Sequence, residues 1–214
     1  MTTSSENWME SSDVLSLFPT YVWKIQLNPS FHQRINPRIR ALLAHMRDGQ
    51  PELERGNGWQ STNELHQREE LSELIACFNR AALKVIRFLK IGYEDFTITG
   101  CWANVNPAGA SHGIHGHPNN FLSGVYYVQT QPGADSINFY DPRIQTGIIR
   151  PPVTELTTGN TDQVVVQVSV GALLLFPAYL QHSVDPNRSQ TLRISISFNV
   201  MFRDFVENLS RPLW

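Results

Sequence analysis

The chain has 214 residues, of which 41% are hydrophobic and 17% charged, a composition typical of a globular protein with one sizeable core. Its formal net charge of -2 excludes the strongly basic field that attracts nucleic-acid backbones. No uncharged apolar run is long enough for a membrane span. We therefore expect no nucleic-acid or membrane partner, and a homodimer is compatible with these features.

The start of the chain and the cysteines indicate the compartment. Residues 1–13 are rich in Ser, Thr and Glu and lack the basic-then-apolar order of a secretory signal. We interpret them as a disordered start, followed by a single domain over 14–214. Only two cysteines are present, Cys77 and Cys101, and Cys77 falls within a helical pattern, which argues against a disulfide scaffold. We expect a cytoplasmic protein.

The first half of the chain is predicted to form one strand and then two helices. Residues 18–25 alternate around a β-rich composition, and Pro29 closes this strand. Apolar residues recur every three or four positions over 31–47 and again over 64–90, which predicts two amphipathic helices. Gly92 ends the second helix.

The second half of the chain is predicted to contain only short strands. Helices followed by many strands favour a barrel or sandwich with helices on one outer face. We expect helical support over about 30–92 and a β core over about 94–204. The predicted strands, separated by Pro, Gly and Asn, are 96–105, 121–128, 136–140, 164–170, 172–176 and 192–202.

Histidines gather ahead of one of these strands. His115 and His117 are two residues apart, so on an extended backbone both imidazoles project from the same face, where they could bind one metal ion. Glycines and a proline around them also indicate a loop, in which solvated histidines are common. His182 follows the apolar strand 172–176 and a turn, at a predicted strand end near the barrel mouth.

The last predicted strand has two unlike faces. If the apolar face packs on helices, the polar face lines the barrel interior, where a guanidinium needs an anionic partner. Arg193 and Ser195 would then bind a carboxylate; a solvated polar face is the alternative. The apolar positions are Ile194, Ile196, Phe198 and Val200, and the polar positions are Arg193, Ser195, Ser197 and Asn199.

In their order and spacing, these stretches resemble the iron(II)- and 2-oxoglutarate-dependent oxygenase superfamily, and most closely a group of uncharacterised members with an H-x-H-P motif. The resemblance covers about residues 104–202. It rests on His115-Gly-His117-Pro118, Ser123-Gly-Val-Tyr-Tyr127, Phe139-Tyr-Asp141-Pro-Arg143, Leu175-Phe176-Pro177, His182-Ser-Val184 and Arg193-Ile-Ser195-Ile-Ser-Phe-Asn199.

The resemblance implies a mainly β fold with helices: a double-stranded β-helix (jelly roll, cupin-like) with the N-terminal helices packed on the outer face of one sheet. It also implies residue roles. His115 and His182 match the two histidine ligands of the metal. Arg193 and Ser195 match the pair that holds the distal carboxylate of 2-oxoglutarate, and Tyr127 matches a tyrosine that hydrogen-bonds the same carboxylate.

Further residues are candidates for the same pocket. Ser123 shares a strand face with Tyr127, and Asn104 could reach the keto-acid end of the cosubstrate. For Asn106, a turn-capping role is at least as good an interpretation as contact with the cosubstrate. The segment from Asp141 to Arg143 is interpreted equally well as a surface turn with its own ion pair. For His112, the third clustered histidine, the favoured interpretation is a simple loop residue. The candidate substrate contacts are Asp141, Arg143 and His112.

His117 departs from the superfamily pattern, because it occupies the position where a carboxylate usually completes the metal ligands. A neutral imidazole leaves the site one charge unit more positive. If His117 does not bind the metal, a carboxylate such as Asp135 or Asp141 would have to complete the set. Three-histidine sites occur in related β-barrels, notably thiol dioxygenases that bind their substrate directly.

The implied function is a non-haem dioxygenase that uses Fe(II), 2-oxoglutarate and O2 to oxidise, by hydroxylation, a small or peptidic substrate, with release of succinate and CO2. Two alternatives stay open at this point. One is a cosubstrate-free three-histidine dioxygenase of the cupin type. The other is a non-catalytic barrel that binds metal.

Overall fold

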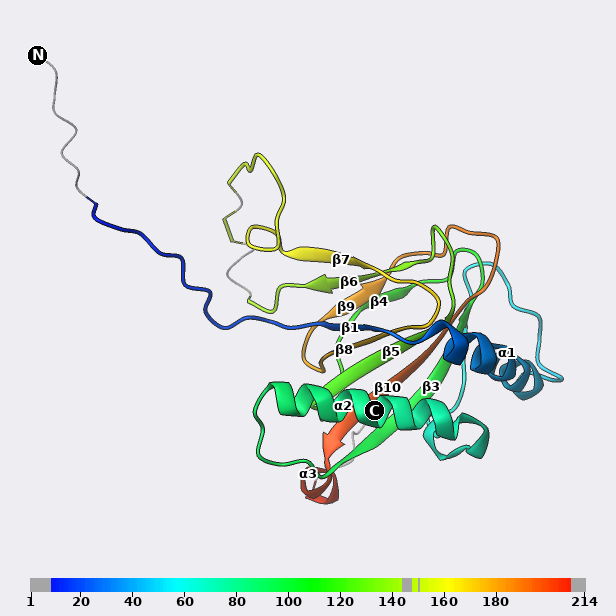
Figure 1. Ribbon diagram of the computed structural model, residues 1–214. Coiled ribbons are helices and arrows are strands. Elements are labelled where there is room, and N and C mark those ends of the chain that lie inside the picture. The colour runs from blue at the N-terminus through cyan, green and yellow to red at the C-terminus, as the bar shows by residue number, and fades with distance from the viewer. Residues whose placement is uncertain (1–8, 144–147, 150, 209–214) are drawn as a thin grey trace, which may run out of the picture.

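The computed structural model describes residues 9–143, 148–149 and 151–208, so residues 1–8 of the expected disordered start lie outside the described residues. Two antiparallel sheets form the body of the protein (Figure 1). The six-stranded sheet has the order β1-β8-β5-β10-β3-β2, formed by Trp23–Gln26, Ala172–Pro177, Leu122–Gln129, Arg193–Phe202, Phe96–Asn106 and Trp59–Gln60. The four-stranded sheet has the order β4-β9-β6-β7, formed by His112–His115, His182–Val184, Ser136–Tyr140 and Gln163–Gln167.

The helices cover the outer face of the six-stranded sheet, whose strands lie behind α2 in Figure 1. Helix α1 (Pro29–Met46) begins with a proline at its first position, and the side chain of Asn28 accepts a hydrogen bond of 2.9 Å from the Ser30 amide. Helix α2 (Ser72–Phe88) buries Phe78, whose ring stacks on Phe198 of β10 at a centroid distance of 4.0 Å. This arrangement confirms the predicted fold class.

Several element boundaries differ from the prediction. The opening strand begins at Trp23, where pairing with β8 starts, whereas Phe18 has a φ of 54° and is 92% exposed. The second predicted helix begins with two 3-10 turns, η1 (Leu65–Gln67) and η2 (Glu69–Leu71), because the extended backbone of Arg68 interrupts it. The short elements β2, β4, β9 and α3 (Arg203–Asn208) have no counterpart among the predicted elements.

Strand β10 separates the helical core from the interior of the barrel. Its apolar residues lie in the core beneath the helices, and its polar residues line a cavity between the sheets. The interior position of the polar face, one of the two alternatives left by the sequence, is therefore the observed one. The apolar residues are Ile194, Ile196, Phe198 and Val200, and the cavity-lining polar residues are Arg193, Ser195 and Ser197.

Gly124 of β5 permits the close packing of the fully buried Phe198 ring, because a Cβ added at Gly124 would collide with that ring. We expect Gly124→Ala to lower the free energy of unfolding by about 1–3 kcal/mol through overpacking. Thermal unfolding measures this effect. Gly92→Ala is the control, since nothing lies within 4 Å of a Cβ added there. Equal melting temperatures for the two variants would contradict the packing described here.

No helix among the described residues is long and apolar enough to cross a membrane.

Candidate active site

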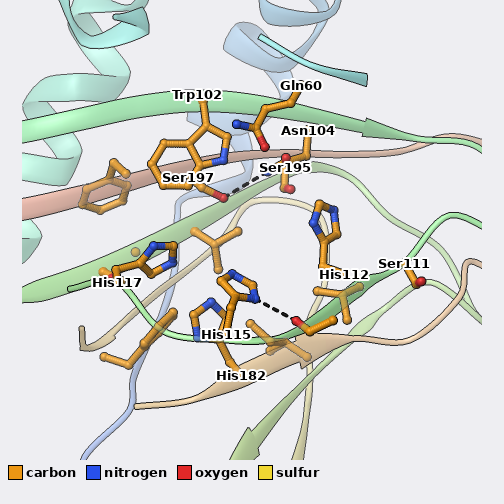
Figure 2. A pocket seen from close by; sticks show the side chains of 18 of the residues that line it. Gln60, Trp102, Asn104, Ser111, His112, His115, His117, His182, Ser195 and Ser197 are labelled. Atoms are coloured by element: carbon orange, nitrogen blue, oxygen red, sulfur yellow. Dashed lines mark hydrogen bonds between the residues drawn. The ribbon is translucent and has the colours of Figure 1, made fainter. Parts of the chain in front are cut away.

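A cavity of about 580 Å³ lies between the two sheets (Figure 2). Both sheets contribute to its wall, and its polar groups come from several strands, among them β3, β4, β9 and β10. No aspartate or glutamate is among the described residues that line it. The lining side chains that matter below are Gln60, Trp102, Asn104, His112, His115, His117, Ser123, His182, Arg193, Ser195 and Ser197.

Three histidines converge at one side of this cavity. His115 at the end of β4 is the cross-strand partner of His182 in β9, and His117 follows two residues after His115. The potential ligand atoms of the three rings all lie within 4.8 Å of one another. Figure 2 shows the three rings around a common space, with ring centroids 4.2 to 5.2 Å apart. The structure thus brings together the two histidines that the spacing singled out and His182, which was placed at a strand end.

Backbone carbonyl groups orient two of these rings. His115 Nδ1 lies 2.8 Å from the carbonyl oxygen of Gly113, and His182 Nδ1 lies 3.0 Å from that of Leu180. A carbonyl oxygen only accepts, so each Nδ1 carries the proton and each Nε2 keeps a free lone pair. This is the usual way in which a second contact fixes the tautomer of a metal-binding histidine. The backbone amide of His117 donates to the Ala178 carbonyl at 2.9 Å, which fixes the loop that carries the third ring.

The electrostatics of the cluster also suit metal binding. Burial lowers the pKa of His182 to about 4, and burial together with the neighbouring His115 lowers the pKa of His117 to about 4. Both rings are therefore neutral near pH 7, as metal ligands must be. Among the described residues, the cluster contains no carboxylate, so neither Asp135 nor Asp141 takes the place of His117.

A buried cationic group stands elsewhere in the cavity. Arg193 is 3% exposed, and its Cζ lies 5.4 Å from the ring centroid of the fully buried Tyr127. Arg193 Nε is buried and makes no hydrogen bond within the described part of the chain. The buried Tyr127 hydroxyl also lacks a partner with hydrogen-bond geometry, although it lies near the guanidinium. Burial raises the pKa of this hydroxyl, which keeps it a donor, so both groups suit a carboxylate ligand.

Two other predicted pocket residues have hydrogen-bond partners inside the barrel. The side-chain amide of Asn104 donates to Ser197 Oγ at 3.2 Å, and Ser123 Oγ donates to Asn199 Oδ1 at 2.8 Å. Ser195 is 4% exposed and pairs across the sheet with Tyr127 on one side and Asn104 on the other. These contacts hold the polar wall of the cavity in one arrangement.

The three candidate substrate contacts separate into two groups. His112 is the first residue of β4 and lines the cavity, so it is not the loop residue that the sequence favoured. Asp141 and Arg143 do not line the cavity; Arg143 Nη2 lies 2.7 Å from Asp141 Oδ2, in a side-chain ion pair at the end of β6. The structure therefore shows the surface turn that the sequence offered as the alternative for this segment.

Several side chains that line the cavity were not predicted from the sequence, and Trp102 and Gln60 are the largest polar ones among them. Trp102 lies on the inward face of β3, two residues before Asn104, and its ring centroid is 5.8 Å from that of His117. The alternation along β3 could have identified it. Gln60 lies on the two-residue strand β2, opposite Asn104, and so short an element has no detectable sequence pattern.

Comparisons with known proteins agree with this site. Residues 100–199 match the profile of a family described as "Putative 2OG-Fe(II) oxygenase". This segment contains most of β3, all of β4 to β9 and most of β10, with the histidine cluster and Arg193. A search of curated proteins found no match.

Solved structures share the fold at low sequence identity. The α-ketoglutarate-dependent epimerase SnoN from nogalamycin biosynthesis is 16% identical with a TM-score of 0.60, over 86% of this chain and 79% of SnoN. A Pseudomonas putida prolyl-4-hydroxylase is 18% identical with a TM-score of 0.58, over 86% and 94% of the two chains. HygX from Streptomyces hygroscopicus, solved with nickel and 2-oxoglutarate, is 12% identical with a TM-score of 0.57, over 86% and 83%.

The family match falls on the β-helix that the motifs predicted and contains the three histidines and the buried arginine. The chain thus matches a family of 2-oxoglutarate- and Fe(II)-dependent oxygenases over residues 100–199, the segment that holds the candidate site.

Proposed function

We propose that this protein uses Fe(II), 2-oxoglutarate and O2 to oxidise, by hydroxylation, a small or peptidic substrate, with release of succinate and CO2. One observation carries the proposal: a three-histidine cluster lines the same cavity as a buried arginine that has no carboxylate beside it among the described lining residues. The family description and the 2-oxoglutarate bound in HygX support the choice of cosubstrate.

The side chains that line the cavity suit both the iron and the 2-oxoglutarate cosubstrate. His115, His117 and His182 would hold the iron and, in an octahedral complex, leave three positions for the keto acid and O2. Arg193, with Tyr127 and Ser195, would hold the distal carboxylate through charge-assisted hydrogen bonds. The iron would supply the chemistry by which O2 oxidises both 2-oxoglutarate and the substrate, whereas the chain would position these groups and limit access of water.

The same arginine favours this proposal over a cosubstrate-free dioxygenase. Arg193 is 3% exposed and has no carboxylate beside it among the described lining residues, so it requires an anionic ligand. The distal carboxylate of 2-oxoglutarate supplies one for any substrate, whereas a cosubstrate-free dioxygenase would need a substrate that is itself anionic. The non-catalytic metal-binding barrel is also less well supported, because a structural metal is normally enclosed by its ligands, whereas this cluster opens into a cavity of about 580 Å³.

The decisive test is anaerobic reconstitution with Fe(II) and 2-oxoglutarate, followed by absorption spectroscopy. We expect the visible charge-transfer band of a keto-acid chelate, and succinate formation once O2 is admitted. A protein that binds iron but gives neither band nor succinate would favour the cosubstrate-free alternative. Iron-dependent O2 consumption without succinate would identify that alternative, and its absence would leave the non-catalytic barrel.

His117→Asp tests whether the third histidine stands in for a carboxylate. The change adds a negative charge next to the iron, so we expect tighter Fe(II) binding with uncoupled 2-oxoglutarate turnover retained. Iron stoichiometry and succinate yield, measured on the same preparation, check this expectation. Aspartate is shorter than histidine, so His117→Glu is the companion variant with longer reach. Both variants losing iron would show that the site is built specifically for an imidazole.

The remaining features of the proposal are a small-molecule or peptide substrate, a cytoplasmic location and a single domain over 14–214 that is able to form a homodimer. Two buried free thiols, Cys77 and Cys101, support the reducing compartment. Size-exclusion chromatography with light scattering would measure the oligomeric state directly.

A further inference from the structure

His112 is a polar group of the cavity to which the proposed function assigns no role. It begins β4, where it pairs with Val184 of β9, and a register irregularity separates it from His115. Its ring lines the same cavity as the metal cluster and Arg193. Figure 2 shows the ring beside the three-histidine cluster, pointing across the cavity toward Ser195.

A buried amide fixes the orientation and tautomer of His112. Asn106 is 2% exposed, and its side-chain nitrogen lies 2.8 Å from His112 Nε2. The amide oxygen of Asn106 faces away, against Gly58, where a Cβ would lie 2.7 Å from it. Asn106 therefore donates and His112 Nε2 accepts, so the neutral ring carries its proton on Nδ1. Within the described residues, the bond to Asn106 is the only hydrogen bond of the His112 side chain.

The same asparagine connects His112 with the cationic group of the cavity. Asn106 is the cross-strand partner of Arg193, so the two side chains leave adjacent strands on the same face. The Arg193 guanidinium is also close enough to affect the imidazole. Burial, then Arg193 and then His115 lower the pKa of His112 to about 4, so the ring is neutral near pH 7.

We propose that His112 donates a hydrogen bond from Nδ1 to the distal carboxylate of the cosubstrate, next to Arg193, and so favours 2-oxo acids that carry that carboxylate. This inference rests on the proposed function, because it requires 2-oxoglutarate in the cavity. A neutral donor suits the position, since a second cation beside Arg193 would be repelled, whereas an acceptor would repel the carboxylate. Asn106 would act as a positioning residue that fixes the tautomer.

Two isosteric variants of His112 separate the two ring nitrogens. The amide nitrogen of His112→Asn lies near the place of Nδ1, and that of His112→Gln near the place of Nε2. We expect 2-oxoglutarate affinity to fall about tenfold in His112→Gln and His112→Ala, the size of one hydrogen bond to a charged group. We expect His112→Asn to stay within about threefold of the parent. The measured quantity is the dissociation constant of 2-oxoglutarate. It is obtained by anaerobic titration of the Fe(II) protein, monitored through the absorption of the chelate band.

A matched ligand makes the test specific for the distal carboxylate. 2-Oxopentanoate keeps the keto acid and chain length of 2-oxoglutarate but lacks that group, so all His112 variants should bind it as the parent does. Equal weakening toward both acids would overturn the proposal, because His112 would then act through the metal or the fold. Unchanged binding of 2-oxoglutarate in every variant would overturn it as well.

Different results would overturn the proposed function and the His112 contact. A parent protein that binds Fe(II) but not 2-oxoglutarate would overturn the proposed function and, with it, the role of His112. A parent that binds 2-oxoglutarate with the same affinity as His112→Gln would overturn only the His112 contact. Melting temperature and iron content of each variant would reveal a folding defect, and His112→Asn, which also breaks the bond to Asn106, controls for the loss of that bond.

Discussion

Replacing Arg193 by alanine is expected to weaken 2-oxoglutarate binding by a factor of about 30 or more, since removal of one partner of a buried, hydrogen-bonded charge pair costs about 2–5 kcal/mol. Arg193 is the only arginine or lysine among the described residues that line the cavity, so no nearby cation can replace it. Calorimetric titration of the Mn(II)-loaded protein with 2-oxoglutarate measures the effect without turnover.

Arg193→Lys refines this prediction. Lysine keeps the charge but cannot offer two parallel donors to a carboxylate, so we expect an affinity between those of the parent and the alanine variant. Arg87→Ala is the control, because Arg87 lies at the surface in an ion pair with Glu94. If Arg193→Ala binds 2-oxoglutarate as tightly as the parent, the cosubstrate site must lie elsewhere.

His182→Ala is expected to abolish stoichiometric iron binding, with a fall in Fe(II) affinity of more than about a hundredfold. His182 is 5% exposed, and the carbonyl of Leu180 fixes its tautomer, so it is a preorganised ligand. Loss of a supporting contact alone typically costs about 10-fold to 100-fold in metal affinity, and loss of the ligand itself should cost more. Metal analysis after gel filtration measures the effect on iron content. A titration with Co(II), monitored through the absorption bands of the bound metal, measures the effect on affinity.

His45→Ala is the matched control for this experiment. His45 lies on α1, paired with Asp48 at 2.9 Å, and its side chain is 82% exposed. Its loss should leave the iron content unchanged. A His182→Ala protein that retains one iron per chain after the same gel filtration would contradict the three-histidine assignment and would leave His115 and His117 as the ligands to be tested next.

The sequence was most informative where a pattern and a chemical requirement coincided. The alternation in β10 predicted one apolar and one polar face, because the period of a strand is fixed by the backbone. An inward arginine under an apolar face packed on the helices was one of the two interpretations that this pattern allowed, and it is the observed one. The spacing of His115 and His117 likewise predicted a shared direction. His182 could be added because it follows a fully apolar strand and so had to lie at a strand end.

Other features depend on contacts between segments distant in the sequence. His112 looks like a loop residue next to glycine, and only pairing with β9 makes it part of a strand. Gln60 enters the cavity wall because β2 adds to the edge of β3 for two residues. Phe18 fits a strand pattern, but pairing with β8 begins only at Trp23. Local propensity contains no information about such partners.

Strand β10 contributes residues both to the cavity and to the core under the helices. Ligand binding in the cavity and the free energy of unfolding are therefore thermodynamically linked. A ligand held by Arg193 and Ser195 binds only when the strand is in place between β3 and β5. At a concentration one hundred times its dissociation constant, such a ligand adds about 2.7 kcal/mol to the free energy of unfolding. The supply of 2-oxoglutarate would then govern resistance to proteolysis as well as turnover, so that a cell poor in this metabolite clears the protein faster.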